Sequence, residues 1–320
     1  MIEARDISKT WGDGTVALEE VSLRVERGTI HGLIGADGAG KSTLFDILVT
    51  LVRPDEGEAT VGGYDIRSEW RAVRRTVGYM PSNFSLYGDL SVRENLNFFA
   101  RIYGRSAGDI EGSMGDIWRQ LEPFERRPAA QLSGGMKQKL ALCCAMVHDP
   151  EVLMLDEPTT GVDPVSRREF WEALRTLAEE GRKTILVSTS YMDEAARCDR
   201  ITLLHEGIVL DELAPGEVAA HYRGTLYEID GGDRALNARL LQLLRGWSLS
   251  GGCYSFGDRI HLNVPLPGLR SETVASYLRA QRIEAERVSI RVIVPTVEDL
   301  FIRLTSLSES DGEEEAEEAW

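Results

Sequence analysis

The sequence predicts an α/β protein with a mixed, mostly parallel sheet, followed by a small α+β domain. Short runs rich in β-branched residues alternate with segments of helical periodicity, which is typical of a mostly parallel sheet covered by helices. A glycine-rich loop separates an apolar strand from an apolar helix at residues 30–52, and a second alternation of strands and helices begins after residue 222. We therefore expect a large domain at 1–222, a smaller one at 223–307, and an acidic disordered tail at 308–320.

The large domain contains runs that are short, apolar and bounded by turn residues, and these predict strands. They are Ile2–Ile7, Ser22–Val25, Thr29–Ile34, Val77–Met80, Val152–Leu155, Thr184–Ser188 and Ile201–Leu204. Leu203–Leu210 predicts a hairpin with its turn at Glu206-Gly207. Helical periodicity predicts helices at Lys41–Val52, Val92–Tyr103, Asp109–Leu121, Gly134–His148 and Pro164–Glu180. Gly181 follows the last of them in the position that glycine prefers after a helix.

The smaller domain repeats this alternation on a shorter scale, after a short closing helix at Pro215–Arg223. Its predicted elements, in order, are strand Leu226–Ile229, helix Arg234–Leu244, strands Tyr254–Phe256 and Ile260–Val264, helix Glu272–Arg282, strand Val288–Val294 and helix Val297–Leu307. The β-α-β-β-α-β order is that of the ferredoxin-like fold.

Composition and charge restrict the possible functions. Apolar residues make up 42% and charged residues 28% of the 320-residue chain, as in soluble globular proteins. Its longest apolar run, Leu140–Val147, is far shorter than a membrane-spanning helix requires, and no signal peptide pattern is present, so we expect any membrane role to be peripheral. Part of the net charge of −16 lies in the tail Ser308–Trp320, and the acidic body argues against nucleic-acid binding.

The four cysteines predict buried, reduced thiols. They stand at positions 143, 144, 198 and 253 and form no C-x-x-C pair, so neither a metal site nor a disulfide is indicated. Cys143 and Cys144 lie within an apolar helical run and are expected in the core.

The glycine-rich loop has the pattern of a phosphate-binding loop. Gly35-Ala-Asp-Gly-Ala-Gly-Lys-Ser-Thr43 fits G-x-x-x-x-G-K-[ST] between a strand and a helix. Its glycines allow backbone N–H groups to approach phosphate oxygens at the positive end of a helix. Lys41 can reach the β- and γ-phosphates, and the Ser42 hydroxyl can bind Mg²⁺. The predicted ATP-binding residues of this loop are Gly35, Asp37, Gly38, Ala39, Gly40, Lys41, Ser42 and Thr43.

A second motif supplies two carboxylates at the end of an apolar strand. Val152–Leu155 is followed by Asp156 and Glu157. Asp156 can hold Mg²⁺ together with Ser42, and Glu157 can polarise the water that attacks the γ-phosphate. The predicted catalytic residues are therefore Lys41, Asp156 and Glu157, and the predicted cofactors are ATP and Mg²⁺.

Between these motifs lies Leu132-Ser-Gly-Gly-Met-Lys-Gln138, and with it the chain resembles the ATP-binding subunits of ABC transporters over residues 1–222. The resemblance implies an ABC ATPase cassette with a helical subdomain at about 84–148. It implies that Ser133, Gly134 and Gly135 contact the γ-phosphate bound to an opposite cassette, and that Trp11 stacks on adenine. Thr160-Gly-Val-Asp163 matches the loop that crosses the dimer interface in that family.

Finer segments are similar to the drug- and polymer-exporting branch of the family. They are Gly78-Tyr-Met-Pro81, Pro164-Val-Ser-Arg-Arg168 and Pro295-Thr-Val-Glu-Asp-Leu-Phe301. The resemblance implies an exporter ATPase at the cytoplasmic face of the membrane, partnered by a second cassette and a multi-span permease. Candidates for the permease contact are Phe84, Leu86, Tyr87 and Leu90, although burial within the domain explains each of them equally well.

Two positions depart from the family pattern. Ser82 stands where the family has a Mg²⁺-binding glutamine, and Ser190 stands where it has a histidine that contacts the γ-phosphate. The hypothesis that follows is an asymmetric pair: this chain has an impaired ATP site but lends an intact signature segment to a partner that hydrolyses ATP. The alternatives are a non-transporter ABC regulator and a non-hydrolysing nucleotide-binding partner.

The segment Val187–Ala195 that contains Ser190 allows two local interpretations. A nucleophile site is not supported, because no general base is placed beside its hydroxyls. Ser190 and Asp193 have the spacing of a helix capping box, with Asp in place of the usual Glu or Gln.

Overall fold

The computed structural model describes residues 1–83, 86–106, 111–179 and 183–306. The chain divides into two compact units, Met1–Pro215 and Gly216–Trp320. This division lies seven residues before the predicted one, because the short helix α7 (Val218–His221) belongs to the second unit. The positions of Phe84, Asp109, Gly181 and the acidic tail lie outside the described residues.

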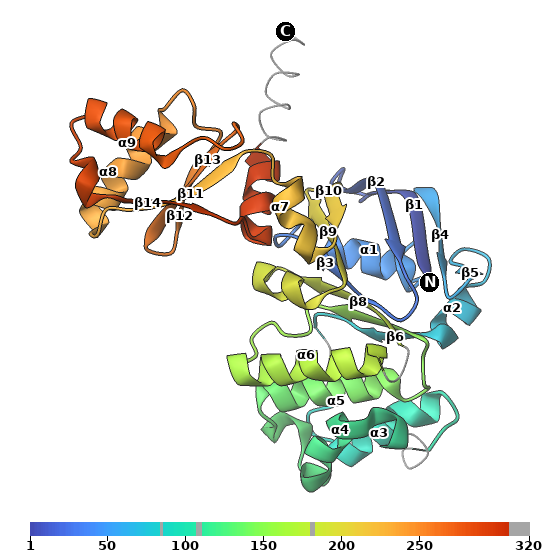
Figure 1. The fold of residues 1–320 in the computed structure, drawn as a ribbon. Coiled ribbons are helices and arrows are strands. Elements are labelled where there is room, and N and C mark those ends of the chain that lie inside the picture. The colour runs from blue at the N-terminus through green and yellow to red at the C-terminus, as the bar shows by residue number, and fades with distance from the viewer. Residues whose placement is uncertain (84–85, 107–110, 180–182, 307–320) are drawn as a thin grey trace. The chain divides into compact units, whose positions relative to one another are not determined.

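The first unit is built on a six-stranded sheet in the order β10-β9-β3-β8-β7-β6 (Figure 1). Its strands are β3 (Ile30–Ile34), β6 (Val77–Met80), β7 (Val152–Asp156), β8 (Thr184–Thr189), β9 (Arg200–His205) and β10 (Ile208–Leu213). The pairs from β9 to β6 are parallel, and only β10 is antiparallel, as the predicted hairpin with β9 requires. Every residue of β3, β7 and β8 is buried, because helices or strands cover both faces of a parallel sheet.

A separate antiparallel sheet has the order β2-β1-β4-β5. Its strands are β1 (Ile2–Thr10), β2 (Val16–Val25), β4 (Glu56–Val61) and β5 (Tyr64–Asp65). The strands predicted at Ile2–Ile7 and Ser22–Val25 are therefore longer than expected and do not join the parallel sheet. Positive φ angles at Asp6 and Glu20 accompany bulges in this sheet, which increase its twist.

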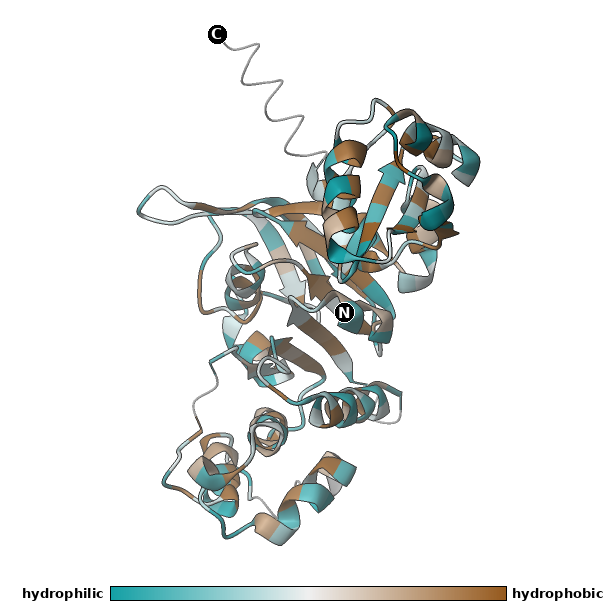
Figure 2. Cartoon of the chain, turned by 90° about the vertical axis from the view of Figure 1, so that its left-hand side faces the viewer, coloured by the Kyte–Doolittle hydropathy of each residue, from teal (hydrophilic) through white to brown (hydrophobic). Residues whose placement is uncertain are grey.

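Helix α1 (Lys41–Leu48) packs into a core that both sheets share. Its Leu44 and Phe45 are fully buried beside residues of β1, β2, β4 and β7. The helix ends four residues before the predicted Val52, because Thr50 adopts a positive φ of 67°. Figure 2 shows hydrophobic residues concentrated in the strands at the centre of the cassette. A further short helix, α2 (Trp70–Thr76), was not predicted.

The helical subdomain comprises α3 (Val92–Ile102), α4 (Glu111–Leu121) and α5 (Gly134–Met146), followed by α6 (Pro164–Glu179). Helix α3 begins with a complete capping box between Ser91 and Glu94. Helix α5 is buried along most of its length and carries the two buried thiols of Cys143 and Cys144, as predicted. Among the described residues no helix is long and apolar enough to cross a membrane.

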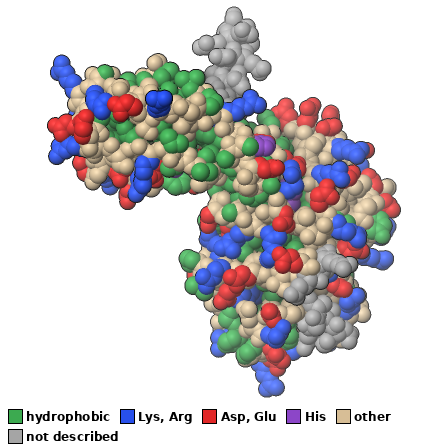
Figure 3. Space-filling view, in the orientation of Figure 1, with side chains coloured by type: hydrophobic (Ala, Val, Ile, Leu, Met, Phe, Trp, Pro, Cys, Tyr) green, Lys and Arg blue, Asp and Glu red, His purple; other side chains and the backbone are tan. Residues whose placement is uncertain are grey.

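The second unit contains a four-stranded antiparallel sheet in the order β12-β13-β11-β14. Its elements are β11 (Thr225–Asp230), α8 (Arg234–Arg245), β12 (Cys253–Phe256), β13 (Arg259–Val264), α9 (Ser271–Ala280), β14 (Ser289–Ile293) and a helix over 297–306. Leu240 and Leu244 of α8 and Val274 and Leu278 of α9 are buried in one core with the sheet. The chain order of these elements is the β-α-β-β-α-β order that the sequence indicates. Acidic and basic side chains are interspersed on the face of the molecule in Figure 3.

Candidate functional site

The glycine-rich loop joins the end of β3 to the start of α1, and its tight path requires glycine at two positions. A Cβ on Gly35 would lie 2.3 Å from the carbonyl oxygen of Leu204. Gly40 has a φ of +99°, and a Cβ there would lie 2.4 Å from the carbonyl oxygen of Ala17. Asp37 and Gly38 are exposed, Thr43 is half-buried and Ala39 is buried, so the outer part of the loop faces solvent.

Lys41 is buried at the first position of α1 and is held by three oxygens. Its Nζ donates to the carbonyl oxygens of Gly35 and Ala36, both at 2.9 Å. The same Nζ lies 3.1 Å from Oε1 of Glu157. The ammonium group is therefore fixed at the mouth of the loop, between the backbone of the glycine-rich loop and the predicted general base.

Asp156 ends β7 beside the first turn of α1. The Ser42 hydroxyl donates to Oδ2 of Asp156 at 2.7 Å, and the Ser188 hydroxyl donates to Oδ1. Ser188 also accepts a hydrogen bond from the backbone N–H of Glu157 at 2.9 Å. Ser188 belongs to no sequence motif and was not among the predicted site residues. Its role follows from the parallel register of β7 and β8, which pairs it with Asp156.

The residues Ser42 and Asp156 fit a magnesium ion. Their adjoining hydroxyl and carboxylate oxygens are hard ligands of the kind that Mg²⁺ prefers, with water and substrate phosphates completing the shell. Ser42 is exposed while Asp156 is buried, so the pair opens to solvent on the loop side.

Glu157 adopts a strained backbone conformation, with a φ of 48°. Its carboxylate is bound on both sides, by Lys41 at Oε1 and by the Thr160 hydroxyl at Oε2, 3.1 Å away. The carboxylate therefore points toward the phosphate loop, where it can orient a water molecule.

The signature residues Ser133, Gly134 and Gly135 form the start of α5. Ser133 is its N-cap and accepts from the backbone N–H of Met136 at 3.3 Å. A Cβ on Gly135 would lie 2.5 Å from the side chain of Ser166, so this glycine permits close packing against α6. No described contact joins these three residues to Lys41, Ser42 or Asp156, so the structure does not bring the two predicted halves of the site together within this chain.

Trp11 lies in the turn between β1 and β2. Its backbone N–H donates to the carbonyl oxygen of Thr15 at 2.8 Å, and Lys9 Nζ lies 5.5 Å from the ring centroid. The side chain is 39% exposed, so its ring can stack on a flat ligand.

Ser82 and Ser190 occupy the two positions that depart from the family pattern. Ser82 is exposed and lines a hollow of about 500 Å³ together with Gln138. Ser190 follows the last residue of β8 and is half-buried.

The predicted capping box of Ser190 and Asp193 is wrong. The helical turn Met192–Arg197 has Tyr191 as its N-cap and no side-chain cap hydrogen bond. The Thr189 hydroxyl instead accepts from the backbone N–H of Tyr191 at 3.0 Å and donates to the Glu194 carboxylate.

Glu194 is a buried carboxylate that sequence analysis did not identify. It is 1% exposed and accepts from the hydroxyls of Thr159 and Thr189, both at 2.7 Å. Arg167 lies 3.6 Å from it and stacks on the ring of Tyr191. Glu194 therefore ties the loop after Glu157 to the strand end that carries Ser190.

A half-buried acid, Asp46, lies behind the site on α1. Burial raises its pKa, the hydrogen bond from Tyr79 opposes this shift, and the charge of Asp156 adds to it.

Comparisons with known proteins agree with this geometry. A sequence profile of the family described as ABC transporter matches residues 18–160. The probable multidrug ABC transporter ATP-binding protein YbhF of Escherichia coli is 42% identical over 240 residues, a match that covers 71% of this chain and 40% of YbhF. This chain therefore matches less than half the length of YbhF.

Other relatives match over almost their whole length. The Nod factor export ATP-binding protein I of Rhizobium etli is 35% identical, with 95% of this chain and 93% of that protein covered. The daunorubicin resistance ATP-binding protein DrrA3 of Streptomyces coeruleorubidus is 36% identical, with 93% of each chain covered.

Solved structures show the same fold over about two thirds of this chain. The structure of an ATP-binding subunit of an ABC transporter superposes with a TM-score of 0.62 at 31% identity, and covers 69% of this chain and 93% of that chain. A dimeric ATP-binding cassette in a post-hydrolysis state, bound to ADP and Pi, gives a TM-score of 0.60 at 27% identity, and covers 67% of this chain and 98% of that chain. The chain therefore belongs to the ABC transporter family, as one of its ATP-binding proteins.

Proposed function

We propose that this chain is the ATP-binding subunit of an exporter and energises transport by a separate membrane subunit. The observation that carries the proposal is the cluster of Lys41, Ser42, Asp156 and Glu157 at one loop. The names of three relatives, which refer to multidrug transport, Nod factor export and daunorubicin resistance, support export as the direction.

The chemistry of the cluster is that of phosphoryl transfer to water. Lys41 and the loop N–H groups would neutralise the β- and γ-phosphates, and Glu157 would accept a proton from the attacking water. Bound Mg²⁺ would supply charge neutralisation at the phosphates, held by Ser42 and Asp156. Lys41 also pairs with Glu157 at 3.1 Å, so a phosphate bound at Lys41 would compete with this carboxylate for the ammonium group.

A complete site would require a second cassette. Ser133, Gly134 and Gly135 are well formed as a helix start but make no described contact with the Lys41 cluster of their own chain. A hydroxyl and free N–H groups at a helix N-terminus suit the γ-phosphate held by another cassette. The dimeric solved neighbour supports this arrangement.

The membrane subunit would dock on an apolar hollow of about 280 Å³ in the first unit. Leu51, Tyr79, Phe99 and Tyr103 are among its lining residues, and Leu51 is 60% exposed. Of the predicted contact residues, Tyr87 is exposed and stacks edge-on against Phe98, while Leu86 and Leu90 are half-buried. Docking there would place the chain peripherally at the cytoplasmic face of the membrane.

We further propose that the pair is asymmetric, because the two serines weaken this chain's own site. Ser190 and Ser82 are too short to supply the imidazole and amide contacts of the family. Removing one preorganised donor from such a site costs about a hundredfold to a thousandfold in rate. The intact signature segment would then serve the ATP site of the partner cassette.

Restoring the missing side chains is expected to raise ATP hydrolysis by the purified chain. Ser190→His should raise kcat at least about tenfold, because an imidazole adds a donor at the γ-phosphate. Ser82→Gln should raise it less, and the double variant most. Steady-state phosphate release measures the effect, with Asp193→Ala as a control on the same loop. Wild-type turnover equal to that of the double variant would contradict the impaired site.

Coupling to a membrane subunit has its own test. The tagged chain, expressed in its native host, should sediment with membranes and co-purify with a multi-span protein. Leu51→Glu should release it, because a charge in the apolar hollow opposes docking. The control is Val165→Glu, which replaces an exposed apolar residue outside the hollow. Equal membrane recovery of all three forms would contradict docking at the hollow.

A further inference from the structure

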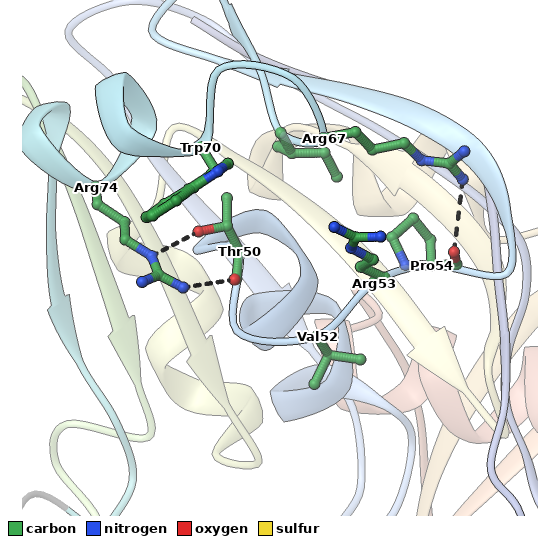
Figure 4. A pocket seen from close by; sticks show the side chains of 8 residues that line it. Thr50, Val52, Arg53, Pro54, Arg67, Trp70 and Arg74 are labelled. Carbon is green, nitrogen blue, oxygen red and sulfur yellow. Dashed lines mark hydrogen bonds between the residues drawn. The ribbon is translucent and has the colours of Figure 1, made fainter.

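We propose that the first unit holds a second anion site, which binds a phosphoryl group in a basic hollow between the end of α1 and helix α2. The hollow has a volume of about 190 Å³ and is formed by two segments (Figure 4). Its lining residues are Thr50, Val52, Arg53 and Pro54 from the first segment, and Ile66, Arg67, Trp70 and Arg74 from the second. None of them belongs to the phosphate loop, so this hollow is distinct from the ATP site.

The hollow concentrates positive charge in a chain whose net charge is −16. Three of its eight lining residues are arginines, and none is acidic. Within the described part of the chain, Arg53, Arg67 and Arg74 make no ion pair. Three guanidinium charges around one small hollow repel one another, and a bound anion would relieve that repulsion.

Two of the arginines are held in place by neutral oxygens. Arg74 donates from Nε to the Thr50 hydroxyl and from a terminal nitrogen to the Thr50 carbonyl, both at 2.8 Å. Arg67 donates to the carbonyl oxygen of Gly57 at 3.1 Å. These hydrogen bonds fix the side chains without neutralising them, so the site is preorganised for an anion.

Acidic residues next to the hollow in sequence are already engaged elsewhere. Asp55 forms an ion pair with Lys9 at 2.8 Å. Asp65 accepts from the backbone N–H groups of Arg67 and Ser68, and Glu69 accepts from the backbone N–H of Asp65 at 3.0 Å. Hydrogen bonds from Ser68, and to a lesser extent the charge of Arg67, lower the pKa of Asp65, but within the described part of the chain none of these three carboxylates forms an ion pair with an arginine that lines the hollow.

Arg53 is the arginine with the most freedom to contact a ligand. It is exposed and makes no hydrogen bond or ion pair among the described residues. Figure 4 shows it beside Pro54, below the side chain of Arg67. Its removal would break no described hydrogen bond or ion pair, so Arg53→Gln tests ligand binding with little effect on stability.

The chemistry favours a phosphoryl group over a carboxylate. A guanidinium binds two oxygens side by side, and a phosphoryl group offers more acceptor oxygens than a carboxylate does, enough for several guanidiniums. The group could belong to free phosphate or to the headgroup of an acidic lipid. Arg74 also lines the apolar hollow proposed for the membrane subunit, so a bound anion would adjoin that docking surface.

Trp70 provides a direct readout. Its ring forms one wall of the hollow, and the guanidinium carbons of Arg71 and Arg74 lie 4.2 and 4.9 Å from its centroid. An anion bound beside Arg74 changes the electrostatic environment of the indole. The Trp70-specific fluorescence is obtained by subtracting the emission of the Trp70→Phe form of each protein from the emission of the form that retains Trp70.

The experiment titrates the full chain with inorganic phosphate at constant ionic strength and follows the Trp70-specific fluorescence. Arg53→Gln should weaken phosphate binding about tenfold, because it removes one charge-assisted contact. Arg75→Gln removes the same charge from helix α2, at a position outside the lining, and should change the affinity less than about twofold. A second arm sediments both variants with phosphatidylcholine vesicles, with and without phosphatidic acid.

Each outcome has a definite meaning. An Arg53-dependent phosphate titration with equal vesicle binding of both variants supports a site for free phosphate. Loss of phosphatidic acid binding in Arg53→Gln alone supports a lipid headgroup. The site is overturned if the Trp70 signal does not saturate and vesicle binding does not depend on Arg53, or if both variants weaken binding equally. These results do not depend on ATP hydrolysis, so they separate this site from the proposed function.

Discussion

Glu194→Ala is expected to lower the free energy of unfolding of the first unit by about 3–5 kcal/mol. The Glu194 carboxylate is fully enclosed and accepts hydrogen bonds from the hydroxyls of Thr159 and Thr189. Its removal leaves both hydroxyls without an acceptor and leaves the half-buried Arg167 without its counter-charge. Urea or thermal unfolding of the full chain measures the loss.

Two further substitutions separate the network from a general effect of the loop. Glu194→Gln keeps the shape and one acceptor oxygen, so it should fall between the wild type and Glu194→Ala. Asp193→Ala removes an exposed carboxylate from the neighbouring position and should change stability by less than about 0.5 kcal/mol. If Glu194→Ala were as stable as Asp193→Ala, the buried network would contribute nothing.

The same network has a functional consequence. Thr159 lies in the loop after Glu157, and Thr189 precedes Ser190 at the end of β8. The Glu194 carboxylate therefore fixes the distance between Glu157, the predicted general base, and Ser190, which stands where the family pattern has a histidine that contacts the γ-phosphate. Loss of Glu194 should also reduce the gain in kcat expected from Ser190→His, because the imidazole would no longer be held at a fixed distance from Glu157.

The parts of the site that the sequence could predict are those whose residues are contiguous. The loop Gly35–Thr43, the strand end at Asp156 and the start of α5 at Ser133 each form a local motif. The structure places the loop between β3 and α1, Asp156 at the end of β7 and Ser133 at the N-cap of α5. Ser188 and Glu194 were missed because their roles depend on contacts across strands and loops, such as the register of β7 and β8. No local pattern distinguishes them from an ordinary strand serine or an ordinary helical glutamate.

Helices and strands without a local sequence signal were likewise missed. The start of α3 was predictable because Ser91 and Glu94 form a capping box, whereas α2 begins after Glu69 without a side-chain cap. Strand β4 alternates charged and small residues at Glu56–Val61, and β5 has only two residues, so neither carries an apolar run. Their strand conformation comes from pairing with β1 and with each other.

The second large effect is expected in the second unit, where Asp299→Ala should cost about 3–5 kcal/mol of stability. Asp299 is fully buried and accepts from the Tyr254 hydroxyl at 2.6 Å, from the Thr296 hydroxyl and backbone N–H, and from Nδ1 of His261. Thr296 and Asp299 also form a capping box at the start of the helix over 297–306. One carboxylate thus attaches this helix to strands β12 and β13.

Hydrogen exchange of peptides from β12 and β13 measures the effect, since these strands lose their attachment to the helix. The control is Glu298→Ala, which removes an exposed carboxylate from the neighbouring position. Faster exchange in Asp299→Ala alone is the expected result. Equal exchange in the two variants would show that Asp299 does not hold the helix to the sheet.

The same carboxylate predicts a specific pH dependence. Burial alone would raise the pKa of Asp299, but the hydrogen bonds from His261, Thr296 and Tyr254 outweigh burial and lower it to about 2 from the usual 3.8. A carboxyl group whose pKa is depressed in the folded state contributes stability that is complete above its unfolded pKa and is lost as pH falls through its folded pKa. The stability difference between the wild type and Asp299→Asn should therefore be constant above about pH 5 and shrink between about pH 4 and 2. A difference that stays constant down to pH 2 would mean that the hydrogen bonds do not favour the charged form, and that Asp299 stabilises the unit by packing alone.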